Sequence, residues 1–259
     1  LQRHGVHTQI YRWPVTFPAT SSDMYAGQGV VDVKGTQGTY TWYTTKDTQQ
    51  AKHIVVKQGP TISTYLRGPY TKGSQGLQEI QHPIEITVQD NSIILSEGQT
   101  TIQKGTWSEW IPVTFKVGML KSISGIYRVY LKDTDPFEMY VSPINIDPRD
   151  PAVAITKPGS LAKQVASEIG LHHTLGIPEE THAVDDGILP FSAYWQQSDT
   201  LRDEKEAMFW QAFETFNRED NAAFLAFIFD NSDRTQHMGW QDKVLANNGS
   251  ISSYIHDYF

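Results

Sequence analysis

An aspartate and a histidine four residues apart follow the longest apolar run of the chain. The run is Ala222–Phe229, and Asp233 and His237 come directly after it. If the run is a strand of an open α/β sheet, ligands bind beyond its carboxyl end. A helical turn after Asp233 would place both side chains on one face. A carboxylate oxygen and an imidazole nitrogen suit Zn²⁺, so this pair is a candidate for part of a metal site.

Spacing alone favours a plainer interpretation, in which Asp233 caps a helix and His237 is an ordinary histidine. Two interpretations also stay open for Asp230, which either orients a metal ligand or caps the turn. His172 and His173, with His182 nearby, form another histidine group. Adjacent histidines in a strand point to opposite faces, so we do not expect these to share one ion.

Composition narrows the function classes. The 259 residues include no cysteine, 21 basic and 29 acidic side chains, and carry a formal charge of −8. Disulfides, thiolate metal sites and cysteine nucleophiles are therefore excluded. The acidic balance argues against a nucleic-acid-binding surface, and no apolar stretch reaches the about 20 residues that span a bilayer. Composition leaves the compartment and the oligomeric state open.

The chain divides into three segments that differ in composition and hydrophobic pattern: residues 1–51, residues 52–147 and residues 148–259. The first contains few charges and many Gly, Thr and Tyr residues. The second contains short β-favouring runs between turn signals, which suggests a sandwich or a barrel. Strands are expected at 5–13, 40–45, 54–56, 61–67, 84–88, 93–95, 110–117, 125–131 and 137–141. Gly68-Pro69 is expected to be a turn.

The third segment has helical periodicity. Leu161, Val165 and Ile169 recur at helical spacing, and we expect a helix that Ser160 caps and Gly170 ends. A second helix is expected over 200–217, with Thr200 and Asp203 as its capping pair. The apolar run that follows, 223–229, is expected to be a strand buried on both faces.

One group of large aromatic side chains lies in the second segment. They would form either a sugar-binding face or part of a packed core, and we favour the core because some of them alternate along a strand. Arg128, within this group, is expected to point outward. The aromatic residues in question are Trp107, Trp110, Tyr127, Tyr130 and Tyr140.

The block 227–240, with Asp233 and His237, resembles the Asp-x-x-x-His metal motif of the type I phosphodiesterase/nucleotide pyrophosphatase group. That group belongs to the alkaline phosphatase superfamily. Further blocks that resemble bacterial members are 14–18 (PVTFP), 32–40 (DVKGTQGTY), 140–148 (YVSPINIDP) and 176–180 (GIPEE). The resemblance covers most of the chain, with only a loose match at about 54–120, and it reverses the plainer interpretation of the pair.

The resemblance implies an α/β core with two divalent metals, usually zinc, and phosphoryl transfer to a Ser or Thr nucleophile and then to water. Asp233 and His237 would bind one metal. The other ligands would include an Asp-His pair, and no Asp-His dipeptide occurs in the chain. Neither Thr36 nor Thr39 has the strand-before-helix context of the nucleophile, although the resemblance places their loop near the active site. We therefore expect an internal piece of a longer protein, inactive by itself.

The expected fold is α/β: a partial alkaline-phosphatase-like core from 1–51 and 148–259, with a β-sandwich-like insertion at 52–147. The expected function is metal-dependent hydrolysis of a small-molecule phosphoric ester of phosphodiester or nucleotide type. If the protein is an enzyme, the sequence also allows sulfatase, phosphonate hydrolase or phosphomutase activity. The alternative is that the protein is not an enzyme but a non-catalytic module whose β-rich part binds substrate, carbohydrate or a protein partner.

Overall fold

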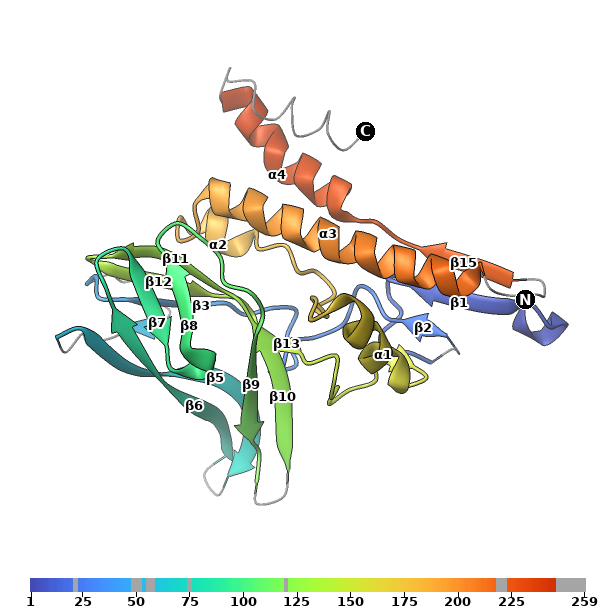
Figure 1. Cartoon of the computed structure of the whole chain (residues 1–259), viewed down its shortest axis with the longest axis horizontal. Coiled ribbons are helices and arrows are strands. Elements are labelled where there is room, and N and C mark those ends of the chain that lie inside the picture. The colour runs from blue at the N-terminus through green and yellow to red at the C-terminus, as the bar shows by residue number, and fades with distance from the viewer. Residues whose placement is uncertain are drawn as a thin grey trace.

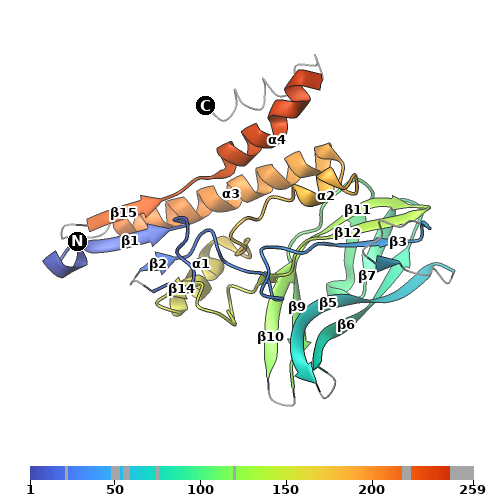
Figure 2. The same cartoon turned by 180° about the vertical axis from the view of Figure 1, so that it is seen from behind.

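The protein is a mixed α/β structure, shown by a computed structural model in Figure 1. Helices and a small sheet occupy one half of the molecule, and most strands gather in the other half. The long helix α3 (Phe191–Phe216) runs along both halves in both views (Figures 1 and 2). The structure describes residues 1–20, 23–47, 53–54, 59–73, 76–118, 121–217 and 223–245.

The small sheet has the order β14-β2-β1-β15. β1 (His7–Tyr11) is central and parallel to both β2 (Met24–Tyr25) and β15 (Ala223–Phe227), whereas β14 (Thr156–Lys157) is antiparallel to β2. The two ends of the described chain therefore meet in one sheet, with Tyr11 opposite Phe227. Parallel pairing places the carboxyl ends of β1 and β15 at the same edge, where ligands of α/β sheets bind. β15 ends the order of the described strands and its Phe224 is 43% exposed, so the expectation of a strand buried on both faces was wrong.

The β-rich half contains three further sheets, with the orders β5-β6-β7-β8, β13-β10-β9 and β11-β12-β3-β4. Because β3 pairs with β12, residues before 52 also contribute to this half. The strands are β3 (Thr41–Thr44), β4 (His53–Ile54), β5 (Thr61–Gly73), β6 (Gly76–Val88), β7 (Ser92–Leu95), β8 (Thr100–Gln103), β9 (Ile111–Lys116), β10 (Ser122–Tyr127), β11 (Val129–Thr134), β12 (Phe137–Val141) and β13 (Asn145–Ile146).

Two expectations for this half were wrong. Gly68-Pro69 is not a turn but lies inside β5, where the register with β6 shifts between Arg67 and Tyr70. A Cβ on Gly68 would lie 2.3 Å from the Phe115 ring, so the packing of that ring requires glycine here. The strand expected at 125–131 is two strands that separate at Arg128, whose side chain is buried rather than outward.

The aromatic residues of this half belong to the core, as expected. Tyr127, Tyr130 and Tyr140 are buried. Trp107 packs on the Tyr140 ring edge-on, with 5.5 Å between centroids, and its indole Nε1 donates to the Ala193 carbonyl. The buried guanidinium of Arg128 lies 5.6 Å from the centre of the Trp107 ring. The arginine is accommodated by aromatic stacking, which explains why its charge did not force it outward.

The helices are α1 (Ser160–Ile169), α2 (His182–Asp185), α3 (Phe191–Phe216) and α4 (Asn231–Leu245). The predicted span of α1 is confirmed, and Gly170 ends it with φ 87°. Ser160 lies inside the helix and makes no capping hydrogen bond, so its predicted role was wrong. α3 begins nine residues before Thr200, whose hydroxyl donates to the Gln196 carbonyl instead of capping. No helix in the described ranges has the length and apolarity that a membrane span requires.

Candidate functional site

Asp233 and His237 lie on one face of α4, in its first two turns. Asp233 Oδ1 and His237 Nε2 are 3.4 Å apart, and the two side chains are 73% and 79% exposed. A helix begins after the apolar run and brings the pair together, which is the condition stated for a shared metal site. Their metal-binding role remains a prediction. Within the described ranges, no group of three or more His, Asp, Glu or Cys side chains is placed to hold a metal.

Asp230 pairs with two cationic side chains beneath this surface. One carboxylate oxygen accepts a hydrogen bond from Lys205 Nζ at 2.5 Å, and the other accepts one from Arg234 at 2.9 Å. Lys205 comes from the middle of α3 and has no exposed side-chain area. Asp230 therefore ties the start of α4 to α3, a role that neither sequence-based interpretation included.

Glu179 completes this buried network from the segment that precedes α2. Its two oxygens lie 3.3 Å from Lys205 Nζ and 2.9 Å from Arg234 Nε. The Asn231 side-chain amide donates to Glu179 Oε1 at 3.0 Å. Asn231 and Arg234 are therefore fixed on either side of Asp233, whose own side chain stays in solvent.

Electrostatics favour the ionised state of Asp230. Burial would raise the pKa of Asp230, but attraction to Lys205, the Lys205 hydrogen bond and the charges of Arg234 and Arg12 outweigh burial and hold that pKa well below its usual range. Arg12 directly follows β1 and is buried, and it donates to the carbonyls of Ala26 and Leu175. Charged groups thus converge beyond the carboxyl ends of β1 and β15, where the topology predicts a functional site.

His172 and His173 are fully buried and have structural partners. His172 Nε2 is 2.8 Å from the Tyr25 hydroxyl, and His173 Nδ1 is 2.7 Å from Glu204 Oε2. Burial lowers the pKa of both imidazoles, which favours their neutral form. The segment is not a strand, and the two side chains contact different partners.

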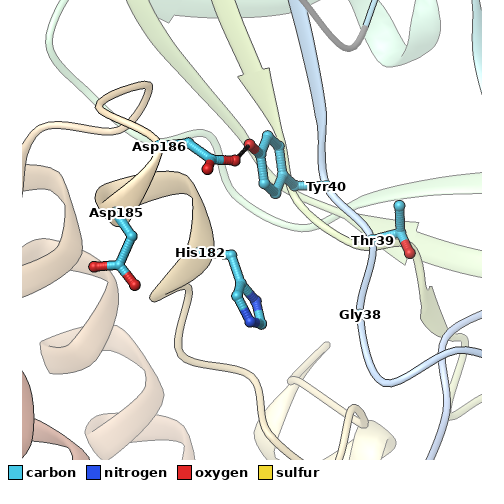
Figure 3. Close-up of a pocket in the computed structure, with 6 residues that line it drawn as sticks. All are labelled: Gly38, Thr39, Tyr40, His182, Asp185 and Asp186. Atoms are coloured by element: carbon cyan, nitrogen blue, oxygen red, sulfur yellow. Dashed lines mark hydrogen bonds between the residues drawn. The ribbon is translucent and has the colours of Figure 1, made fainter. Parts of the chain in front are cut away.

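A hollow lies between the loop before β3 and helix α2 (Figure 3). It has a volume of about 380 Å³ and is lined by Gly38, Thr39, Tyr40, His182, Asp185 and Asp186. The Tyr40 hydroxyl donates to the Asp186 carboxylate (Figure 3). The loop itself is shaped by buried Asp32, which accepts backbone N–H donors from Lys34, Thr36 and Thr39. His182 thus lines a hollow separate from the buried pair His172 and His173.

Sequence reasoning missed Glu179, Lys205 and Arg12. A signal for Lys205 was present, because it continues the apolar stripe of α3, in which Leu201 and Met208 are buried. A lysine within such a stripe needs a buried carboxylate partner. Glu179 and Arg12 gave no comparable signal, because their partners lie far away in the sequence.

Comparisons with known proteins identify no relative. The chain matches no protein-family model, no curated protein and no solved structure. Its function is therefore argued from its own residues.

We predict that Lys205→Met destabilises the protein by about 3–5 kcal/mol, because it removes one of the two cations that the carboxylates of Asp230 and Glu179 share, the other being Arg234. Urea unfolding followed by circular dichroism measures the change. Lys163→Met, at an exposed position of α1, is the matched control and should stay within about 0.5 kcal/mol of wild type. Adding Asp230→Asn to Lys205→Met should recover part of the loss. Strictly additive effects would contradict a coupled network.

Asp230 should also make stability depend on pH. Its folded-state pKa is depressed, so its contribution is present above the unfolded pKa of about 3.9 and is lost as the pH falls toward the folded value. The difference in unfolding free energy between wild type and Asp230→Asn should therefore be largest near neutral pH and shrink below about pH 4. Denaturant titrations across this range measure it. A difference independent of pH would show that the carboxylate charge is unimportant.

Proposed function

We propose that Asp233 and His237 bind one divalent metal, most suitably Zn²⁺, as part of a metal-dependent phosphoric ester hydrolase. The distance between Asp233 Oδ1 and His237 Nε2 carries the proposal. Two ligands at about 2.0–2.2 Å from a tetrahedral zinc ion are about 3.3–3.6 Å apart. The observed 3.4 Å falls in this range, and both side chains face solvent, from which an ion can enter.

The plainer alternative is an ordinary helical ion pair at spacing i,i+4. Such pairs on exposed helices contribute only about 0.3–0.5 kcal/mol. The place of the pair supports the metal role, because α4 starts just beyond the carboxyl end of β15 and is anchored there by buried charges. Arg234 forms ion pairs on the inner side, whereas Asp233 and His237 remain exposed.

The reaction class rests on the resemblance to type I phosphodiesterases and nucleotide pyrophosphatases, and the two-metal, alkaline-phosphatase-like core is part of the same proposal. A bound metal would offset charge on the phosphoryl group of a phosphodiester or nucleotide-type substrate. On this chain, Asp233 and His237 would hold that metal, and the buried network would fix their helix. The Ser or Thr nucleophile and the other metal ligands would come from outside these 259 residues.

Zinc titration by calorimetry tests the metal role. Wild type should bind one Zn²⁺ weakly, because the described residues supply two ligands and the remaining positions are left to water. Asp233→Asn and His237→Ala should each weaken binding at least about tenfold, the lower end of what loss of metal-site interactions costs. His82→Ala is the matched control, because His82 Nε2 is 3.2 Å from Glu97 Oε1 in an unrelated His–carboxylate pair.

Unchanged zinc affinity in both site variants would contradict the metal role and favour a non-catalytic binding module. Hydrolysis of bis(p-nitrophenyl) phosphate is the second readout. The chain alone should show no zinc-dependent turnover, because no nucleophile is assigned within it. Zinc-dependent turnover by the chain alone would contradict the assignment of the nucleophile to residues outside it.

A further inference from the structure

Two neighbouring carboxylates before α2, Glu179 and Glu180, contact different parts of the molecule. Glu179 belongs to the buried network, where it contacts Lys205 of α3 and Arg234 of α4. Glu180 faces the β-rich half, where its Oε2 accepts a hydrogen bond from the Tyr140 hydroxyl at 2.7 Å. Both partners of this bond are buried. A single peptide bond therefore joins the network beneath α4 to the sheet that contains β12.

Tyr140 is a fixed point in the β-rich half. Its strand, β12, has β11 on one side and β3 on the other. The Tyr140 ring stacks on Tyr40 with 5.5 Å between centroids, and Trp107 packs against it edge-on. A ring enclosed in this way in a close-packed interior has little freedom to move. The hydroxyl of Tyr140 therefore holds Glu180 at a defined place.

The far end of α2 is attached to the same half. Asp186 accepts a hydrogen bond from the hydroxyl of Tyr40, which directly precedes β3 (Figure 3). Glu180 Oε1 accepts the backbone N–H of Ala183 at 2.9 Å, and this bond fixes the first turn of α2. We call residues 179–186 the strap. Because tyrosine hydroxyls hold it near both ends, the strap cannot shift against the β-rich half without losing buried hydrogen bonds.

The strap reaches the candidate site through Glu179. Its Oε1 accepts a hydrogen bond from the Asn231 side-chain amide at 3.0 Å, and its Oε2 lies 2.9 Å from Arg234 Nε. Asn231 begins α4 and Arg234 directly follows Asp233, so these contacts hold the helical turn that carries Asp233. The first turn of a helix frays readily, because its N–H groups lack intrahelical partners. Holding this turn preorganises Asp233 to share a ligand with His237.

We propose that Tyr140 and Glu180 are positioning residues for the Asp233–His237 pair and act through Glu179. The zinc readout of this inference rests on the proposed function, whereas its effect on the first turn of α4 does not require zinc. The plainer alternative is that the Tyr140–Glu180 bond stabilises the β-rich half and has no particular effect on α4. A variant that breaks a comparable bond elsewhere in that half separates the two.

Tyr140→Phe tests the inference, with Tyr43→Phe as the matched control. Tyr43 is a buried tyrosine on the neighbouring strand β3, and its hydroxyl donates to the Tyr65 carbonyl at 2.7 Å. Hydrogen exchange without denaturant is followed at the amides of residues 235–237, whose intrahelical acceptors lie in the first turn of α4. These amides should exchange about two- to tenfold faster in Tyr140→Phe, the range that loss of one hydrogen bond allows. Zinc affinity should fall by a similar factor, and the control should leave both unchanged.

A double variant provides a conservative rescue. Tyr140→Phe leaves the buried Glu180 carboxylate without its hydroxyl donor, and such a group is costly. Glu180→Gln removes the charge and keeps an oxygen for the Ala183 N–H. Adding Glu180→Gln to Tyr140→Phe should therefore slow exchange at α4 again, and no recovery would overturn the role given to Glu180.

Equal exchange and equal zinc affinity in Tyr140→Phe and Tyr43→Phe would overturn the inference and leave the metal role intact. A wild type that binds no zinc would contradict the proposed function instead. The exchange comparison would still decide whether Tyr140 positions the first turn of α4.

Discussion

The helical half depends on the hydrogen bonds that the buried ammonium group of Lys205 donates to two carboxylates. A lysine without exposed side-chain area is tolerated only when carboxylates compensate its charge. Asp230 and Glu179 supply that compensation from two segments far apart in the sequence, one after β15 and one before α2. Because Arg234 joins both carboxylates, the first turn of α4 has a single favourable position. The orientation of the exposed Asp233–His237 pair follows from this buried arrangement.

Predictions from the sequence agree with the structure where they rest on interactions between residues that are close together in the sequence. The span of α1 and the α4 start after β15 were predictable, because apolar spacing, Gly170 and the polar residues after Phe229 are local signals. The early start of α3 was not, because its first turns bury polar side chains: Gln197 accepts the backbone N–H of Glu180. Arg128 was misplaced for a similar reason, because its aromatic partner Trp107 lies outside the strand in which Arg128 was predicted.

The candidate site was predictable only in its outer part. Asp233 and His237 were found from spacing and from a family resemblance, and the structure adds their common face and their separation. The ion network beneath them depends on contacts across 25 to 55 residues of sequence, beyond the reach of any local pattern.

Nuclear magnetic resonance of the histidine side chains is the most direct test of the central claim, that α4 presents a metal-binding pair. The chain has nine histidines, and zinc can be titrated into protein labelled with ¹⁵N-histidine. The account predicts that the ring nitrogens of His237 shift first, while buried His172 and His173 do not respond. A first response at another histidine, or an unshifted His237 at excess zinc, would contradict it.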